Sequence, residues 1–225
     1  MPIAPKKLVS KQRARSQADK DVRRTQLTEA ATRLFAHASF EAVTIARVAE
    51  AAGVAKGTAY IYFATKEALF LELVRAELTQ WLDSLTLTLK RLRSTQPARA
   101  VPNAVARSLA ERPVLRRLLV LLHTVIEPNI DEASARNFKL FLRDLLTEAG
   151  AAIAPKIPGL SLEDAMTLVL QTHALVISIT QLADPPPVIA RVIAADASLQ
   201  SMCLDFEPFL ADTLRTLVRG TLGKM

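Results

Sequence analysis

Apolar side chains recur at intervals of three and four residues along most of this chain, which is the spacing of one face of an α-helix. The first clear stripe comprises Leu27, Ala30, Ala31, Leu34 and Phe35. No convincing run of alternating apolar and polar residues, the pattern of a half-buried strand, interrupts the stripes. We therefore predict an all-α fold with helices near residues 27–35, 45–52, 55–62, 65–92, 102–110, 113–126, 131–153, 161–183, 188–200 and 204–219.

Prolines and polar residues separate the predicted helices. The stretch 94–102 contains two prolines among polar residues and is the clearest linker. Further prolines lie between the predicted helices or at the start of one, where no helical hydrogen bond needs their missing backbone N–H. They are at positions 113, 128, 155, 158 and 185–187. The apolar stripe of 65–92 is too broad for a coiled-coil seam, so we expect that helix to pack within a bundle.

Residues 44–63 predict two short helices joined by a tight turn. Thr44 is a suitable N-cap for the first helix, and Gly53 is a suitable glycine stop. This order is the helix-turn-helix pattern, in which the second helix can enter the major groove of DNA. Its exposed positions carry donor-rich and aromatic side chains, which suit phosphates and base edges: Lys56, Thr58, Tyr60 and Tyr62.

The positive charge of the chain is concentrated at the same end. Residues 1–66 hold 12 Lys and Arg against 5 acidic residues, which accounts for the whole net charge of +7. Such asymmetry is typical of a polyanion-binding end, for nucleic acid or for an anionic membrane surface, joined to a neutral body. A solvated basic tail is the alternative. Together with the helix-turn-helix pattern, the charge favours DNA.

The segment from Gln26 to Phe70 resembles the DNA-binding region of the TetR family of bacterial transcriptional regulators. The matching residues are Ala30-Ala31, Leu34-Phe35, Phe40, Thr44-Ile45, Val48-Ala49, the run Ala52-Gly53-Val54-Ala55-Lys56-Gly57-Thr58, Tyr60, Tyr62-Phe63 and Lys66-Glu67-Ala68-Leu69. The composition of residues 1–20, rich in Lys, Arg, Ser, Gln and Ala, predicts a flexible basic arm. The resemblance implies a three-helix DNA-binding domain at 21–66 and a helical-bundle domain at 67–225 for ligand binding and dimerisation.

The resemblance also implies roles for individual residues. Lys56 and Gly57 would approach base edges, and Lys66 would fix a phosphate at a helix N-terminus. Tyr60 as a core residue and Lys66 as a solvated surface lysine are the alternatives. The basic arm could enter the minor groove or simply aid solubility. The remaining positions implied to contact phosphates are Thr44, Arg47, Thr58, Tyr60 and Tyr62, of which Tyr62 could also reach a base.

Three residues depart from the family pattern. Ser39 stands where glycine is usual, so we expect the turn before the second helix to be strained or reshaped. Ala55 replaces a capping serine, at a local cost of about 0.5–2 kcal/mol. Ala59 replaces a larger leucine. These changes predict a less rigid recognition helix and do not remove the DNA-binding interpretation.

Two apolar helices near the C-terminus are the predicted dimer surfaces. Segment 161–183 is apolar on nearly all sides and must be covered on more than one of them. Segment 204–219 carries a stripe that includes Phe206, Phe209 and Leu214. The resemblance implies a homodimer on a pseudo-palindromic DNA operator, and pairing both segments across a two-fold axis would give it a four-helix interface. Burial inside one subunit is the alternative.

Polar side chains within apolar helices are the candidates for binding a small effector. We select His123, Glu127, Asn137, His173 and Gln181 as polar contacts, with Trp81, Phe138 and Phe141 as walls. The alternative for each of these residues is that it is a hydrogen-bonded or packed core residue that contacts no ligand. We find no histidine pair four residues apart and no suitably placed carboxylate, so neither a metal nor a cofactor is expected.

The function that these patterns favour is a repressor that an apolar or amphipathic ligand releases from its operator. Alternatives are a non-specific basic DNA-binding protein, a membrane-surface protein, or an enzyme using the helical pocket. No catalytic motif is present, and the single cysteine, Cys203, excludes an internal disulfide and is expected to be inert. No secretory signal or long apolar run is evident, so a cytoplasmic location is expected.

Overall fold

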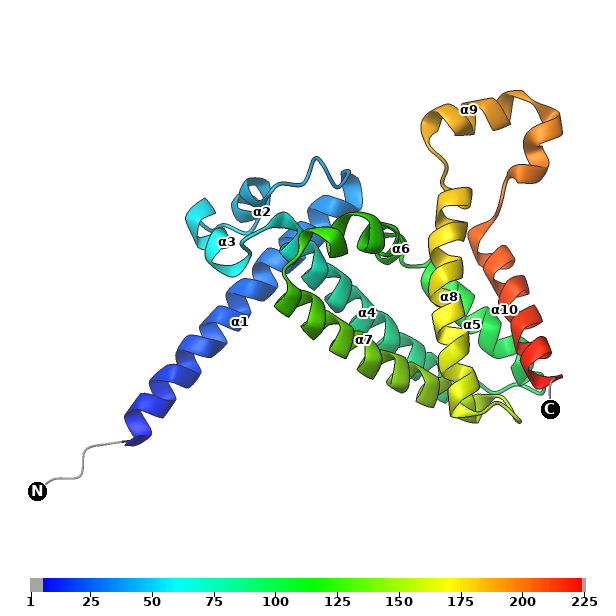
Figure 1. The fold of residues 1–225 in the computed structure, drawn as a ribbon, viewed down its shortest axis with the longest axis horizontal. Coiled ribbons are helices and arrows are strands. Elements are labelled where there is room, and N and C mark those ends of the chain that lie inside the picture. The colour runs from blue at the N-terminus through cyan, green and yellow to red at the C-terminus, as the bar shows by residue number, and fades with distance from the viewer. Residues whose placement is uncertain (1–5, 224–225) are drawn as a thin grey trace, which may run out of the picture. The chain divides into compact units, whose positions relative to one another are not determined.

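The computed structural model describes the backbone of residues 6–223 and the side chains of residues 19–223 (Figure 1). Within these residues the chain is helical and contains no strand, which confirms the predicted all-α class. It divides into two compact units, residues 1–73 and 74–225. The boundary falls inside one helix, α4 (Lys66–Arg91), so both units contain part of that helix.

The first unit is built from α1 (Lys6–His37), α2 (Ile45–Ala51), α3 (Lys56–Tyr62) and the beginning of α4. Its core is aromatic at one end: the ring of Phe70 lies 5.1 Å from that of Phe35 and 4.7 Å from that of Phe40, both edge-on. Arg24 on α1 forms an ion pair of 2.9 Å with Glu72 on α4. These contacts hold α1 against the start of α4. The other buried apolar side chains here include Leu27, Ala30, Ala31, Val48, Ala49, Ala59 and Phe63.

Helix α1 begins much earlier than the sequence pattern indicated. The segment 1–20 was expected to be an arm, whereas the structure has helical backbone from Lys6. The segment is rich in Lys, Arg, Gln and Ala, which are good helix formers even without an apolar face to bury. Side-chain contacts of the arm, including the expected minor-groove contacts of Lys6, Lys7, Lys11, Arg13 and Arg15, lie outside the described residues.

The second unit is a bundle of the following elements: the rest of α4, α5 (Pro97–Ala110), α6 (Pro113–Leu121), a π turn (Leu122–Ile126), a 3-10 turn (Glu127–Asn129), α7 (Glu132–Ile153), a 3-10 turn (Ala154–Lys156), α8 (Leu162–Ala183), α9 (Pro187–Ala195), a 3-10 segment (Ala197–Met202) and α10 (Phe206–Leu222). Helix α8 packs against α6, α7 and α10, and α10 packs against α5. The bundle therefore forms around α8.

Two predicted helices, 102–110 and 188–200, have different bounds in the structure. Helix α5 begins at Pro97 inside the predicted linker, because proline at the first helical position needs no N–H partner. Pro102, the predicted first residue of this helix, lies inside it. The single helix expected at 188–200 is divided, because Asp196 is extended and its carboxylate accepts the N–H of Ser198 at 2.8 Å.

Close packing of α7 on α8 depends on a small residue. A β-carbon added at Gly150 would lie 2.7 Å from Cγ of Met166, closer than two such atoms can approach. By length and composition α8 is also the one described helix that could cross a membrane. Its contacts with α6, α7 and α10 place part of its surface inside the bundle.

Several large apolar side chains of the second unit remain exposed. Most of them belong to α8, α9 and α10, and α9 itself contributes no buried residue. Those on the three helices are Leu162, Leu170, Leu182, Val188, Ile189, Val192 and Phe209. Exposed apolar side chains in such number mark a surface that contacts something other than water.

Candidate functional site

The turn between α2 and α3 has the local chemistry that the sequence predicted. Thr44 is extended, and its hydroxyl accepts the N–H of Arg47 at 3.3 Å, so it caps α2. Gly53 has φ of 67°, a left-handed conformation that glycine adopts without cost. The next N–H, of Val54, donates to Ala49 at 2.9 Å. These bonds fix the point at which α3 begins.

Helix α3 presents most of its side chains to solvent. Lys56 and Gly57 are exposed, Thr58 and Tyr62 are half-buried, and Ala59 is buried against the rest of the unit. The side chain of Tyr60 is 45% exposed, which contradicts the alternative that it is a core residue. A β-carbon at Gly57 would meet nothing within 4 Å, so the surface there is open.

Ile61 is a further α3 residue that the sequence analysis did not select. It is 81% exposed, which is unusual for so large an apolar side chain. It follows Gly57 by four residues and therefore lies on the same helical face. The four-residue spacing from Gly57 is the signal in the sequence that indicates this position.

Lys66 and Arg47 are held more firmly than free surface cations. The Lys66 ammonium lies 3.7 Å from the centre of the Phe40 ring and 5.9 Å from that of Phe70. Burial lowers the pKa of Lys66, against the opposing charges of Glu67 and Glu41. Arg47 donates through its guanidinium to the carbonyl of Ala42. Both charges thus have defined positions in the first unit.

The departures from the family pattern have mixed effects. Ala55 makes no side-chain cap bond at the start of α3, as expected. Among the described residues only glycines have positive φ, so Ser39 occupies its turn without the strain that we expected. Its hydroxyl instead accepts the N–H of Ala42 at 3.4 Å and helps the turn to form.

A cavity of about 410 Å³ lies within the second unit. It is lined mainly by buried leucines and valines, with a few polar and basic side chains. The lining residues are Leu78, Trp81, Leu109, Leu119, Leu122, His123, Lys139, Leu142, Arg143, Leu145, Leu146, Val169, Leu170, Thr172, His173 and Val176. This composition suits a mainly apolar small molecule with a polar group at one point.

The polar part of the lining is a connected network. His123 places Nδ1 3.0 Å from a Glu127 carboxylate oxygen and Nε2 2.9 Å from Nε2 of His173. Lys139 donates to the other Glu127 oxygen at 2.6 Å. Because a carboxylate only accepts, Nδ1 of His123 donates to Glu127, and a single proton joins the two facing Nε2 atoms of His123 and His173. The network therefore orients both rings.

Burial and neighbouring charges set the protonation of this network. Burial, followed by the charge of His123, lowers the pKa of His173 to about 4, although Glu127 opposes the shift. Burial alone raises the pKa of Glu127, but the hydrogen bonds from Lys139 and His123 outweigh it and leave that pKa below its ordinary value. His173 is therefore a neutral imidazole near neutral pH, able to donate or accept.

The structure separates the predicted ligand contacts into two groups. Trp81, His123 and His173 line the cavity, and Glu127 supports it through His123. Phe138, Phe141 and Gln181 do not line it. Phe138 is fully buried elsewhere in the bundle, and Gln181 is exposed two turns beyond His173 on α8.

Phe141 and Asn137 belong to another surface. They line a groove between α4 and α7, where the guanidinium of Arg75 lies 4.4 Å from the centre of the Phe141 ring. These residues lie on a different face of α7 from Lys139 and Arg143, which the sequence analysis did not select. The spacing of apolar residues along α7 does not by itself indicate which face of this helix lines the cavity.

A carboxylate does flank a histidine, contrary to our statement from the sequence. Glu127 follows His123 by four residues and binds it. The spacing was visible in the sequence, but a proline follows Glu127 directly and the two residues were assigned to different segments. Among the residues that the structure describes, no three His, Cys, Asp or Glu side chains lie together in a way that suits a metal ion. Cys203 is exposed and unbonded to another cysteine.

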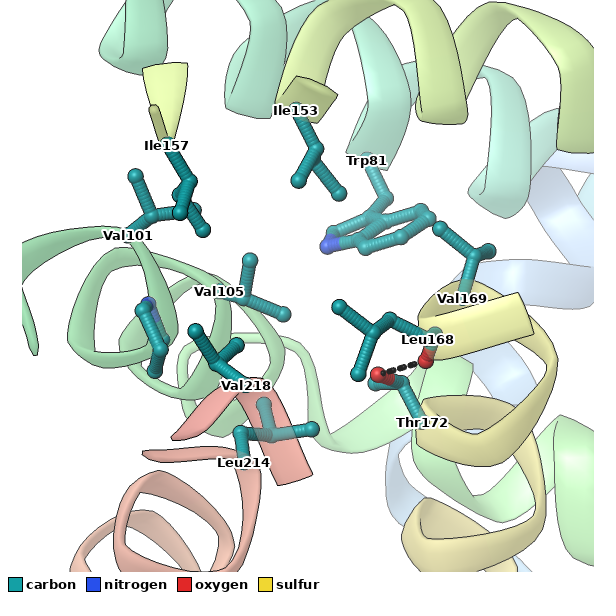
Figure 2. Close-up of a pocket in the computed structure, with 11 residues that line it drawn as sticks. Trp81, Val101, Val105, Ile153, Ile157, Leu168, Val169, Thr172, Leu214 and Val218 are labelled. Atoms are coloured by element: carbon teal, nitrogen blue, oxygen red, sulfur yellow. Dashed lines mark hydrogen bonds between the residues drawn. The ribbon is translucent and has the colours of Figure 1, made fainter. Parts of the chain in front are cut away.

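A second, much smaller cavity of about 30 Å³ adjoins the first (Figure 2). Trp81, Val169 and Thr172 line both cavities. The rest of its wall is apolar and comes from α5, α8, α10 and the end of α7 with the turn after it: Val101, Pro102, Val105, Ile153, Ile157, Leu168, Leu214 and Val218.

Solved structures with this fold are known from several bacteria. A regulator from Streptomyces coelicolor A3(2) aligns with a TM-score of 0.58 at 18% identity, over 90% of this chain and 100% of that one. FadR of Bacillus halodurans, a fatty acid degradation regulator, aligns with a TM-score of 0.56 at 15% identity, over 89% and 98%. FadR of Bacillus subtilis, solved in complex with stearoyl-CoA, gives 0.53 at 15% identity, over 86% and 96%.

Two family models together match nearly the whole sequence. Residues 27–73 match the bacterial regulatory proteins of the tetR family, and residues 75–224 match the tetracyclin repressor-like C-terminal domain. No curated protein matches the sequence significantly. The family models meet at the boundary between the two compact units, one containing the helix-turn-helix and the other the cavity. The chain is therefore a member of the TetR family of helix-turn-helix transcriptional regulators.

Proposed function

We propose that this chain is a homodimeric, cytoplasmic repressor that acts by binding rather than by catalysis. An amphipathic ligand in the cavity of the second unit lowers its affinity for a pseudo-palindromic operator. The observation that carries this proposal is the combination, in one chain, of an exposed recognition helix with an apolar cavity that contains a single polar network.

The recognition helix α3 reads the operator. Lys56 and Gly57 are exposed at its start, where Lys56 can donate to guanine and Gly57 can admit a thymine methyl group. Ile61, on the same face as Gly57, adds an apolar contact to a base or sugar. The phosphate contacts come from Thr44, Arg47, Thr58, Tyr60, Tyr62 and Lys66, whose defined positions favour a fixed docking geometry.

Dimerisation supplies the second recognition helix. One seven-residue helix reads too few bases for specificity, and two copies must lie about 34–36 Å apart to enter successive major grooves. The exposed apolar side chains Leu170 and Leu182 on α8 and Phe209 on α10 support an interface through these two helices. Replacing Leu170 and Phe209 together by lysine should then give monomers in sedimentation measurements and weaken operator binding.

The ligand acts by favouring one state of the dimer over another. Helix α4 carries Lys66 in the first unit and Leu78 and Trp81, two cavity residues, in the second. A coupling of about 1–3 kcal/mol through such a helix would change operator affinity roughly 5- to 150-fold. The related fold of Bacillus subtilis FadR in complex with stearoyl-CoA supports an acyl-type amphipath as the ligand class.

The experiment that tests this function is a gel shift with the operator and with matched random DNA across a salt titration. A specific repressor should prefer the operator at every salt concentration. A non-specific basic protein should bind both DNAs with the same affinity, and that affinity should fall equally for both as the salt concentration rises. Deleting residues 1–20 should weaken binding to both DNAs without abolishing the preference. Equal binding to acidic vesicles and to the operator would instead support the membrane-surface alternative.

A further inference from the structure

The two cavities of the second unit share one wall. Trp81, Val169 and Thr172 line both the cavity of about 410 Å³ and the cavity of about 30 Å³. Trp81 is by far the largest of the three and comes from α4, whereas the other two lie on α8. Figure 2 shows the indole beside Ile153, Val169 and Leu168 at the edge of the smaller space. The indole is therefore the main partition between the two cavities.

The lining changes in character from one end to the other. In the larger cavity the polar contributors His123, Lys139 and Arg143 are exposed, whereas Trp81 is only 5% exposed. The side of the wall beyond Trp81 is apolar, because the hydroxyl of Thr172 is already bonded to the Leu168 carbonyl at 2.7 Å. An amphipath thus gains most with its polar group near His123 and its tail directed at Trp81.

Two consecutive hydrogen bonds fix the orientation of the indole. Its Nε1–H donates to the hydroxyl of Ser108 at 3.0 Å, and that hydroxyl donates to the Val105 carbonyl at 2.7 Å. Rotation of the ring would leave a buried N–H without a partner. Trp81 is consequently a stationary wall rather than a side chain that swings aside for a long ligand.

We infer that the larger cavity takes the alkyl tail of an amphipath, and that Trp81 determines the longest tail that fits. The inference rests on the proposed function only in taking an amphipath as the ligand. The space beyond the indole, about 30 Å³, is far smaller than the cavity of about 410 Å³ in front of it. Removing the indole joins the two spaces and lengthens the tail that the protein accepts.

The test is the chain-length dependence of binding. The affinities of straight-chain fatty acids from octanoate to stearate, and of the matching primary alcohols, are measured by calorimetry on the full chain. Affinity for the wild type should rise about fourfold with each methylene until the tail reaches Trp81, and then stop rising. In Trp81→Leu the rise should continue to longer chains, and in Trp81→Phe it should continue over a shorter extension.

A second substitution separates the wall from a general loosening of the core. Val105 lines only the smaller cavity, so Val105→Phe placed in the Trp81→Leu background should fill the new space and return the limit toward the wild-type length. If Trp81→Leu fails to fold, Ser108→Ala keeps the indole and removes its hydrogen bond. That variant should then bind the longest chains more tightly than the wild type does.

Two results would overturn the inference, and they are distinguishable. An unchanged length limit in both Trp81 variants, with all affinities shifted in parallel, means that Trp81 supports the core but does not limit the tail. A protein that binds no fatty acid or alcohol of any length has another ligand class, which removes the amphipathic effector from the proposed function as well. Operator binding, measured in the same preparations without ligand, shows separately whether the repressor function stands.

Discussion

In residues 1–73 the candidate base-contacting side chains lie on one seven-residue helix, whereas the cavity in residues 74–225 is lined from five helices and a π turn. The first arrangement depends on short-range chemistry: a cap at Thr44, a left-handed glycine at Gly53, and side chains directed to solvent. The second depends on the packing of distant segments. Substitutions should therefore act locally and separably in the first unit, and through burial and protonation in the second.

The largest expected effect is on operator discrimination. Lys56→Ala combined with Tyr62→Ala removes one proposed base contact and one phosphate or base contact, each worth about 1–3 kcal/mol. We expect operator affinity in gel shifts to fall roughly a hundredfold or more, with a much smaller loss on random DNA. Ligand-induced shifts in melting temperature should be unchanged. Undiminished operator preference would mean that α3 does not read the bases.

The next effect concerns the cavity and its neutral histidine. The folded pKa of His173 is about 4, below its ordinary 6.5, so the unfolded chain binds more protons between these values. The free energy of unfolding should then decrease as the pH falls from 6.5 toward 4, by up to about 3 kcal/mol. Urea unfolding across this window measures the slope.

His173→Gln is the matched control for the pH effect, because it keeps a polar group of similar reach and removes the titration. Its unfolding free energy should depend less steeply on pH than that of the wild type in the same window. Parallel curves for the two proteins would show that His173 does not titrate as its burial implies.

A smaller effect tests the glycine turn of the first unit. In Gly53→Ala the new side chain meets no atom within 4 Å, so the whole cost comes from the left-handed backbone, about 1–2 kcal/mol. Gly57→Ala makes the same chemical change within α3, also in open space, and should stabilise slightly through helix propensity. Thermal unfolding of the two variants should therefore shift in opposite directions.

The smallest effect restores a missing cap. Ala55 has the extended backbone of an N-cap but no side-chain acceptor, so Ala55→Ser can accept the N–H of Thr58 and stabilise α3 by about 1 kcal/mol. Ala55→Val, with similar bulk and no acceptor, is the control. Equal amide exchange of α3 in both variants would show that the cap is not what limits this helix.

The same contrast explains which features the sequence could predict. Thr44, Gly53 and the exposed face of α3 follow from residues within a few positions of one another, and the structure agrees with each. The contact of His123 with His173 joins residues fifty positions apart, for which no local pattern exists. Phe138 and Phe141 were chosen as cavity walls because aromatic side chains suit such walls, but packing turned the Lys139 and Arg143 side of α7 to the cavity.

Segment 113–126 was predicted as one regular helix, and its last five residues form a π turn instead. A π turn is equivalent to one extra residue inserted into an α-helix, and an insertion rotates every later side chain by about 100° around the axis. His123 belongs to that turn and Glu127 follows it directly. The gain or loss of a single residue at this point would therefore turn other side chains toward the cavity, while the residues of α4, α5, α7 and α8 keep their places in its wall.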